Sequence, residues 1–190
     1  DLDDVTITGF EGTPTIQTPD LGGGKNFIKI NSETSGVTVR NLKLEPDNAS
    51  GDFPTVLAAK GSDAVLDGIV FDGDQSDPQG NPPITVSGEN PTIKNLEVIG
   101  GVISASGTGT VTLRNNYING ALTEGIFATS RADFIVENNQ VNNHNDQDSN
   151  SKEIKLQVPK SVNGETDTAA QIESLLTENS VNSVQVDGDA

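Results

Sequence analysis

A six-residue phrase returns along the chain, and it constrains the fold more than any other feature of the sequence. Each copy has an apolar residue, a polar residue, Asn or Gly, two variable residues and a second apolar residue. The copies are Val39–Leu44, Leu66–Phe71, Ile93–Val98, Leu113–Ile118 and Val136–Val141. A period of about 20–27 residues indicates a stacked architecture, because one such unit cannot bury its own apolar face.

The repeating unit is strand-like. Alternation of apolar and polar residues is clear in Val37–Val39 and in Ile154–Val158, and this is the period of a half-buried strand. A loop and a second short strand follow each phrase. We expect these second strands at Thr55–Ala59, Ile84–Ser87, Val102–Ala105, Ile126–Thr129 and Ile154–Val158, with an earlier partial rung at Val5–Phe10 and Phe27–Ile30. Coils with two or three strands at this period must pair in parallel with the next turn.

These phrases resemble the coils of one known group of folds. Val37–Leu42 and Leu113–Ile118 are similar to ordinary coils of the right-handed parallel β-helix of the pectin-lyase-like superfamily. The resemblance covers roughly residues 5–158 and implies an all-β solenoid of about six rungs. It implies the fold and says little about activity.

In that superfamily, Asn residues in register form a hydrogen-bonded ladder inside a turn. The resemblance places such a structural ladder at Asn41, Asn95, Asn115 and Asn138, with Gly68 interrupting it. A buried amide has donors and an acceptor to satisfy, and the same amide one turn away satisfies them. The alternative is that each Asn is a turn residue that tolerates the left-handed region.

The C-terminal segment departs from the rhythm. We expect residues 1–160 to form the β-helix and residues 161–190 to form a C-terminal cap within the same domain. Thr168–Gln171 fits a capping box, and apolar residues follow at helical spacing, which predicts a helix over about 168–178. Another rung is the alternative, since Leu176–Val181 weakly echoes the repeat phrase. A trailing strand is expected at Val181–Val186.

Composition narrows the setting of the protein. The formal net charge of −17 disfavours nucleic acid and anionic membranes as partners, and no apolar run is long enough to be inserted into a membrane. The chain has no Cys, and it is rich in Asp, Asn, Gly, Ser and Thr. These features favour an extracellular or cell-surface protein, met as a mature form or an excised fragment.

The loops between the strands of each rung form an acidic edge, and two stretches in it have the spacing of a cation site. Asp72, Asp74 and Ser76 recur as Asp146, Asp148 and Asn150, so oxygen side chains stand at positions one, three and five. Position six holds Asp77 and Ser151 in place of Gly, and position twelve holds Pro83 and Gln157 in place of Glu. We therefore expect an irregular Ca²⁺ site and no organic cofactor, with solvated polar turns as the alternative. Its expected ligands are Asp72, Asp74, Ser76, Asp77, Asp146, Asp148 and Asn150.

We find no catalytic constellation in the sequence. Lys94 and Arg114 are possible bases by family analogy, but they belong to an outward position that reads Arg40, Asp67, Lys94, Arg114 and Glu137 along the stack. Charges of mixed sign on neighbouring rungs are expected to pair. The only histidine, His144, lies in a polar loop without an obvious acid partner.

The sequence therefore predicts a non-catalytic extracellular β-helix with a structural, adhesive or self-assembly role that depends on calcium. Self-association is expected through uncapped ends of the coil, where strand edges have no partner. One alternative is a polysaccharide lyase or glycoside hydrolase, or a fragment of one, that acts on an acidic polysaccharide. Another is a segment of a phage tail spike.

Overall fold

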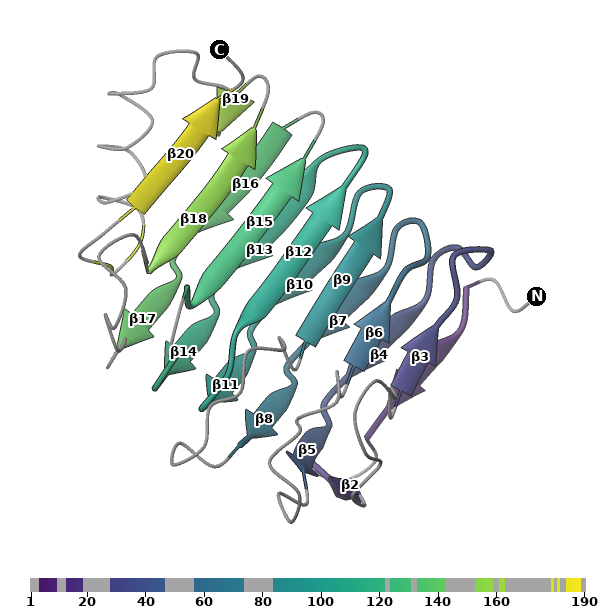
Figure 1. Ribbon diagram of the computed structural model, residues 1–190. Coiled ribbons are helices and arrows are strands. Elements are labelled where there is room, and N and C mark those ends of the chain that lie inside the picture. Colours follow the sequence, from purple (N-terminus) through teal and green to yellow (C-terminus); the bar gives the residue numbers. More distant parts are fainter. Residues whose placement is uncertain are drawn as a thin grey trace.

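The computed structural model describes residues 4–9, 13–18, 28–46, 57–73, 84–121, 124–130, 133–142, 153–158, 161–162, 179, 181 and 184–188. Within these residues the regular elements are all strands, and the strands form three sheets. The pairings inside each sheet are parallel, as Figure 1 shows. The chain is therefore an all-β protein with three parallel sheets.

The three sheets, here named A, B and C, share the strands in rotation. Sheet A contains β1 (Thr6–Thr8), β4 (Thr38–Arg40), β7 (Val65–Asp67), β10 (Thr92–Lys94), β13 (Val111–Arg114), β16 (Asp133–Glu137) and β19 (Ser161–Val162). Sheet B contains β2 (Thr15–Thr18), β5 (Lys43–Pro46), β8 (Val70–Asp72), β11 (Glu97–Ile99), β14 (Tyr117–Asn119) and β17 (Gln140–Asn142). Sheet C contains β3 (Ile28–Ile30), β6 (Leu57–Ala59), β9 (Ile84–Gly88), β12 (Ile103–Gly107), β15 (Ile126–Ser130), β18 (Ile154–Val158) and β20 (Val184–Gly188).

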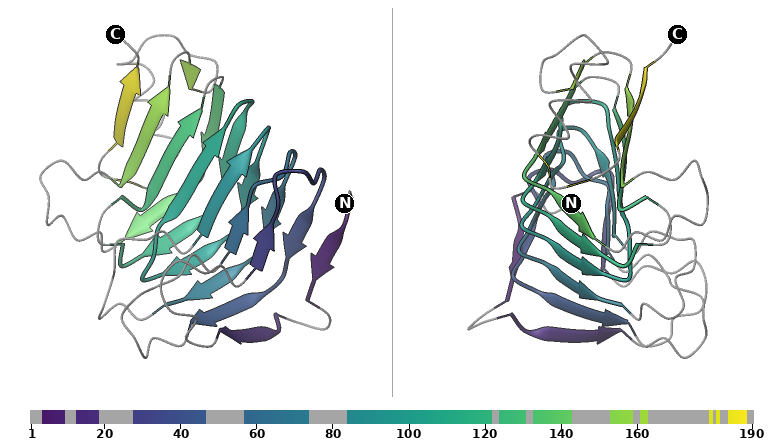
Figure 2. Two further views of the ribbon diagram at one scale, coloured as in Figure 1. Left: turned by 45° about the vertical axis from the view of Figure 1, so that its right-hand side comes forward. Right: turned by 90° about the vertical axis from the view of Figure 1, so that its left-hand side faces the viewer.

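The chain visits sheets A, B and C in that order and then returns to sheet A, so three consecutive strands make one rung. This order fits a parallel β-solenoid. The strands stack along one axis from the N-terminal β1–β3 to β20 (Figure 2). β19 and β20 continue sheets A and C beyond the sixth rung, so the described part of residues 161–190 pairs directly with the stack.

The repeat phrase proves to be two strands and a corner. In Val39–Leu44, the first two residues end β4, Asn41 forms the corner, and β5 follows. The phrases lie in register, because Leu66 pairs with Val39 and Ile93, and Leu113 pairs with Ile93 and Val136. The spacing in the sequence therefore gave the correct turn-to-turn alignment, while the number of strands in each rung, which the sequence left open, is three.

The expected second strands are the strands of sheet C. β6, β9, β12, β15 and β18 coincide with the predicted ranges to within a few residues. The sequence pattern did not indicate β2, which supplies sheet B in the first rung. The trailing strand is present as β20, and Val181 precedes it. The predicted helix over 168–178 lies outside the described residues.

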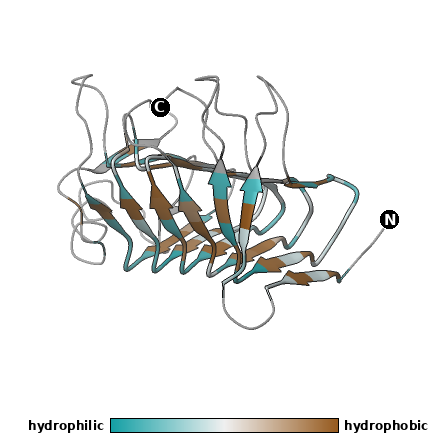
Figure 3. Cartoon of the chain, turned by 90° about the horizontal axis from the view of Figure 1, so that it is seen from below, coloured by the Kyte–Doolittle hydropathy of each residue, from teal (hydrophilic) through white to brown (hydrophobic). Residues whose placement is uncertain are grey.

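The core is a narrow column of mostly aliphatic side chains to which all three sheets contribute. Val39, Leu66, Ile93, Leu113 and Val136 are each 0% exposed and stack on one another. Phe71 and Phe134 are the largest side chains in it. Apolar residues recur along the strands of the stack (Figure 3). Such a core needs few aromatic residues, which agrees with a chain that is 32% hydrophobic and 4% aromatic.

Candidate functional site

The corner between sheets A and B holds the four Asn residues predicted as a ladder. Asn41, Asn95, Asn115 and Asn138 have φ of 56°, 55°, 54° and 55°, and Gly68 in the same position has 63°. This is the left-handed region, which Asn and Gly adopt more easily than other residues. The side chains are exposed, and Asn115 Nδ2 donates to Asn95 Oδ1 at 3.2 Å. The turn role that the sequence left open is therefore present at these positions.

A buried stack of amides lies one residue further along the chain. Asn116 Nδ2 donates to Asn139 Oδ1 at 2.8 Å, and Asn139 Nδ2 donates to Asn179 Oδ1 at 2.8 Å. The three side chains are 1%, 0% and 4% exposed. Each amide also donates to a backbone carbonyl: Asn116 to Ile93, Asn139 to Leu113 and Asn179 to Val136. Asn116 and Asn139 thus each make two donations from the side-chain amide inside the protein, as buried amide groups require.

The sequence contains a signal for this stack outside the four expected ladder positions. Asn is doubled in Asn115-Asn116 and in Asn138-Asn139, whereas the same position is Leu42, Ile69 or Leu96 in earlier rungs. Asn179 lies in the segment that weakly echoes the repeat phrase, and it accepts the Asn139 backbone N–H at 2.8 Å. Asn179 therefore occupies the position in a seventh rung that Asn116 and Asn139 occupy in the fifth and sixth rungs.

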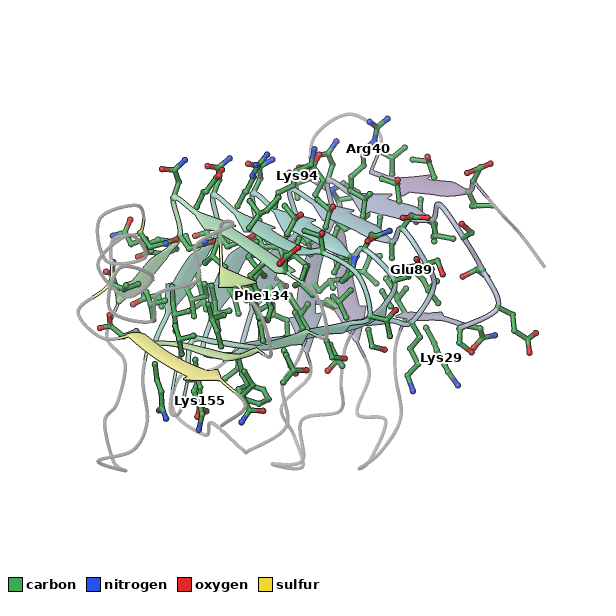
Figure 4. All side chains as sticks on the ribbon, turned by 90° about the horizontal axis from the view of Figure 1, so that it is seen from above. Lys29, Arg40, Glu89, Lys94, Phe134 and Lys155 are labelled. Atoms are coloured by element: carbon green, nitrogen blue, oxygen red, sulfur yellow. The ribbon has the colours of Figure 1, made fainter. Side chains whose placement is uncertain are left out.

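The outer column of sheet A carries the charges that we considered as bases. Lys94 Nζ lies 3.4 Å from Asp67 Oδ2, and Arg114 Nε lies 2.9 Å from Glu137 Oε2. Arg40 and Lys94 stand on this face of the molecule, and Lys29 and Lys155 stand on the opposite face (Figure 4). Each of the two candidate bases therefore forms an ion pair with a carboxylate on a neighbouring rung. These pairs are partly exposed, so they contribute little to stability.

The edge where sheet B ends carries an acid–lysine–acid cluster. Lys43 Nζ lies 2.5 Å from Glu45 Oε1 and 2.8 Å from Asp72 Oδ2 on the next rung. Hydrogen bonding to Asp72, and then to Glu45, raises the pKa of Lys43 above its usual range. Of the residues expected to hold calcium, Asp72 is described, and its carboxylate already binds this ammonium group.

The remaining predicted calcium ligands, Asp74, Ser76, Asp77, Asp146, Asp148 and Asn150, lie outside the described residues, as does His144. Among the side chains that the structure does describe, no three His, Cys, Asp or Glu residues are grouped in a way that could hold a metal ion. The calcium site therefore stays a prediction about the loops.

Further along the same edge, another acid lies beside a lysine. Glu124 Oε1 is 4.0 Å from Lys155 Nζ. Glu153 is only 7% exposed, and its carbonyl accepts the N–H groups of Gly125 and Ile126 at 3.0 Å each. These two backbone hydrogen bonds join the start of β15 to the residue that precedes β18 on the next rung.

The outer face of sheet C is lined by hydroxyl groups. Thr85 pairs with Ser104 and Ser87 with Ser106, and Thr129 continues the second column. Phe127 follows Ser104 in the first column, between the buried Ile126 and Ala128, so its ring belongs to the outer face. The sequence alone does not reveal this face, because the register of sheet C decides which side chains share it.

In the part of the chain described here, no helix has the length and apolar character needed to cross a membrane. Searches of protein-family models, curated proteins and solved structures gave no match to this chain. The resemblance to the pectin-lyase-like superfamily therefore rests on the repeat phrase and on the order of the parallel strands.

Proposed function

We propose that this protein is a non-catalytic structural module, a right-handed parallel β-helix that acts outside the cell or at its surface in adhesion or assembly. One observation carries the proposal. Three basic side chains on the outer faces, which a reaction could use as bases, bind carboxylates of neighbouring rungs. Lys43, Lys94 and Arg114 each have a carboxylate within 3.4 Å.

The arrangement of these groups suits a scaffold better than a catalyst. An acid–base pair for catalysis needs a pKa close to the working pH, which usually requires burial or a like charge nearby. Lys43 instead lies between two carboxylates, which favour its charged form. Partly exposed pairs of opposite charge along a column keep successive rungs in register without forming a reactive centre.

The competing enzyme hypothesis has a direct test. Incubation with polygalacturonate and with alginate, with and without Ca²⁺, should give no rise in unsaturated-uronate absorbance and no new reducing ends. Product that forms with the intact chain, and that is lost in Asp72→Asn or Arg114→Gln, would overturn the proposal. The variant Thr112→Ala, on the same sheet as Arg114, controls for general effects of a substitution on that face.

Calcium binding by the acidic loops is a second part of the proposal. If Asp72 is a ligand, Lys43 competes with the ion for its carboxylate, because Lys43 Nζ lies 2.8 Å from Asp72 Oδ2. Calorimetric titration should therefore show tighter Ca²⁺ binding in Lys43→Met and weaker binding in Asp72→Asn. Equal affinities in both variants and the unchanged chain would place any calcium away from Asp72.

The outer face of sheet C favours one further candidate function, the binding of a polysaccharide. Two columns of hydroxyl groups and the ring of Phe127 share this face, and sugars bind proteins through hydroxyl hydrogen bonds and through stacking on aromatic rings. In affinity electrophoresis, Phe127→Ala should lose any retardation by an acidic polysaccharide. Tyr117→Ala, which removes an aromatic ring from sheet B, should keep it.

A further inference from the structure

The outer face of sheet A carries two columns of solvent-accessible side chains from β4 to β16. The threonine column is Thr38, Val65, Thr92, Thr112 and Ile135, and the charge column is Arg40, Asp67, Lys94, Arg114 and Glu137. Arg40 and Arg114 are exposed, and the side chains of Lys94 and Glu137 are 39% and 38% exposed. Arg40 and Lys94 stand together on this face in Figure 4. The charge column is therefore accessible to a partner.

The order of charges in this column is one that a second copy can match. From β4 to β16 the charges read positive, negative, positive, positive and negative. We consider a second copy whose column runs in the reverse direction, with the two Lys94 side chains opposite each other. Arg40 then lies opposite Glu137 of the second copy, and Asp67 lies opposite Arg114 of the second copy. Each of these contacts occurs twice, so opposite charges meet at every position except that of Lys94.

Neighbouring registers of the two reversed columns fit less well. With Asp67 opposite its own copy, Arg40 faces Lys94. A shift of half a rung from the Lys94 register sets either Lys94 or Arg40 against Arg114, so like charges meet. With Arg114 opposite its own copy, Arg40 and Asp67 extend past Glu137, the last residue of the column. The charge order therefore selects the register centred on Lys94.

We propose that two copies of this chain pair through the outer faces of sheet A, with their stacks antiparallel and a two-fold axis that runs along β10. The inference rests on the proposed function, since it names the partner in assembly as a second copy of the chain. Rotation about the strand direction reverses the order of the rungs and keeps each residue at its place along the strand, so charge column meets charge column. Rotation about the stack axis would set each charge opposite its own copy or opposite the threonine column.

The pairing gives Arg40 a carboxylate. Lys94 and Arg114 bind Asp67 and Glu137 at 3.4 and 2.9 Å, whereas no carboxylate among the described side chains pairs with Arg40. Glu137 of the second copy lies opposite Arg40 in the proposed register. Asp67 and Glu137 then each face a cation of their own chain and a cation of the second copy. The isolated ion pairs of one chain thus become parts of networks, which stabilise more than isolated surface pairs do.

The threonine column allows the two faces to approach closely. All of its residues are β-branched, and such side chains pack well on a pleated surface. Thr38 lies opposite Ile135 of the second copy, Val65 lies opposite Thr112, and Thr92 meets its own copy. The contact extends over four rung spacings of about 4.8 Å, which is small for a permanent dimer. We therefore expect weak association that is populated at high protein concentration.

Exchange of charges tests the register. Arg40→Glu sets two carboxylates opposite each other and Glu137→Arg sets two guanidinium groups opposite each other, so each variant alone should sediment as a 19.8 kDa monomer. An equimolar mixture should recover the dimer that the unchanged chain forms, because residue 40 of either chain then faces a residue 137 of opposite charge. Lys60→Glu changes the net charge by the same amount as Arg40→Glu. It replaces an exposed lysine that follows β6 in sheet C, so the dimer should persist.

A mixture that stays monomeric while the unchanged chain dimerises would overturn the proposal, and so would loss of the dimer in Lys60→Glu. Circular dichroism shows whether Arg40→Glu and Glu137→Arg fold. If either variant does not fold, cross-linking decides.

Single cysteines test the same contact without a change of charge, since the chain has no native cysteine. Thr92→Cys lies on the axis, so two copies of this variant should join through a short bismaleimide across faces about 10 Å apart. Thr38→Cys should join to an Ile135→Cys chain and not to itself, because its own copy lies about 19 Å further along the stack. Ser104→Cys, in mid-stack on the outer face of sheet C, is the matched control. Thr38→Cys dimers as abundant as the mixed product, or no product above the control, would overturn the proposal.

The two proposals fail in different ways. A chain that stays monomeric in both experiments and turns over no polysaccharide would reject the pairing and leave the structural role intact. A paired chain that turned over polysaccharide would reject only the non-catalytic role.

Discussion

Neighbouring asparagines in this protein have different tasks. Asn138 has φ of 55° and an exposed side chain, so its backbone conformation is what the corner requires. Asn139 is 0% exposed, and its amide links the amides above and below it. The sequence shows both as Asn, and only the position of the corner relative to the strands assigns one to the surface and the other to the interior.

The first residue-scale prediction follows from that difference. Asn139→Ala leaves the buried amides of Asn116 and Asn179 without a shared partner, so the free energy of unfolding should fall by about 3 kcal/mol. Asn138→Gly retains the corner conformation and should change it by no more than about 0.5 kcal/mol. Urea denaturation of both variants measures the difference. Equal losses would show that the buried stack has no special contribution.

Two glycines give a second contrast at this scale. Gly88 has φ of 142°, and a Cβ there would lie 2.3 Å from the backbone oxygen of Gly61. Gly68 has φ of 63°, and its Cβ would lie 2.9 Å from Oδ1 of Asn41, a side-chain atom that can move. Gly88→Ala should therefore cost about 3 kcal/mol and Gly68→Ala about 1 kcal/mol. The opposite order in urea denaturation would contradict the stated geometry at Gly88.

At the scale of strands, the sequence predicted which residues pair between successive turns more accurately than it predicted which strands make up one turn. The phrase starts at 39, 66, 93, 113 and 136 are register partners, because an apolar interior repeats wherever a rung repeats. β2 was missed, since Thr15–Thr18 has one apolar residue and no copy of the phrase. The charge column of sheet A was recognised from spacing alone. The cluster at Lys43 was not, because Glu45 and Asp72 each lie one residue beyond the six-residue phrase.

That cluster predicts how stability responds to alkaline pH. Asp72 and Glu45 raise the pKa of Lys43 in the folded chain, so the folded state holds this proton more tightly than the unfolded state does. The contribution is fully present below the ordinary lysine pKa of about 10.4 and is lost as pH rises through the raised value. The stability difference between the unchanged chain and Lys43→Met should thus stay constant from about pH 7 to pH 9 and shrink above about pH 10.5. Urea denaturation at each pH measures it, and a difference that vanished by pH 9 would contradict the assignment.

At the scale of the whole molecule, the net charge disfavours the folded shape. A solenoid is elongated, and repulsion among like charges acts along its length. Glu33, Glu89 and Glu97 are exposed acids on different rungs. Pairs such as Arg114 with Glu137 neutralise only part of a formal charge of −17. We therefore expect electrostatic repulsion, rather than the packing of the core, to limit the stability of the folded state.

Screening should relieve this repulsion. The thermal midpoint should rise by about 5 °C when NaCl is increased from about 0.01 M to about 0.5 M, since about 1 kcal/mol corresponds to 2–4 °C in a chain of this size. Replacement of Glu33, Glu89 and Glu97 by Gln should raise the midpoint at low salt and reduce its response to salt. Circular dichroism melts measure both quantities. A midpoint that fell with salt would show that attractive ion pairs dominate.

The register between the fourth and fifth rungs also bears on how such a gene can lengthen. Ile93 pairs with Leu113, and Asn95 and Asn115, at a separation of 20 residues, occupy the same corner. A tandem duplication of the codons for residues 93–112 would therefore add one complete turn and leave every later side chain on its original face. A duplication one codon shorter would exchange the inward and outward residues of the strands that follow. Growth of this protein by unequal recombination is thus tolerated in steps of whole turns, and the sequence lengths that evolution can sample are discrete.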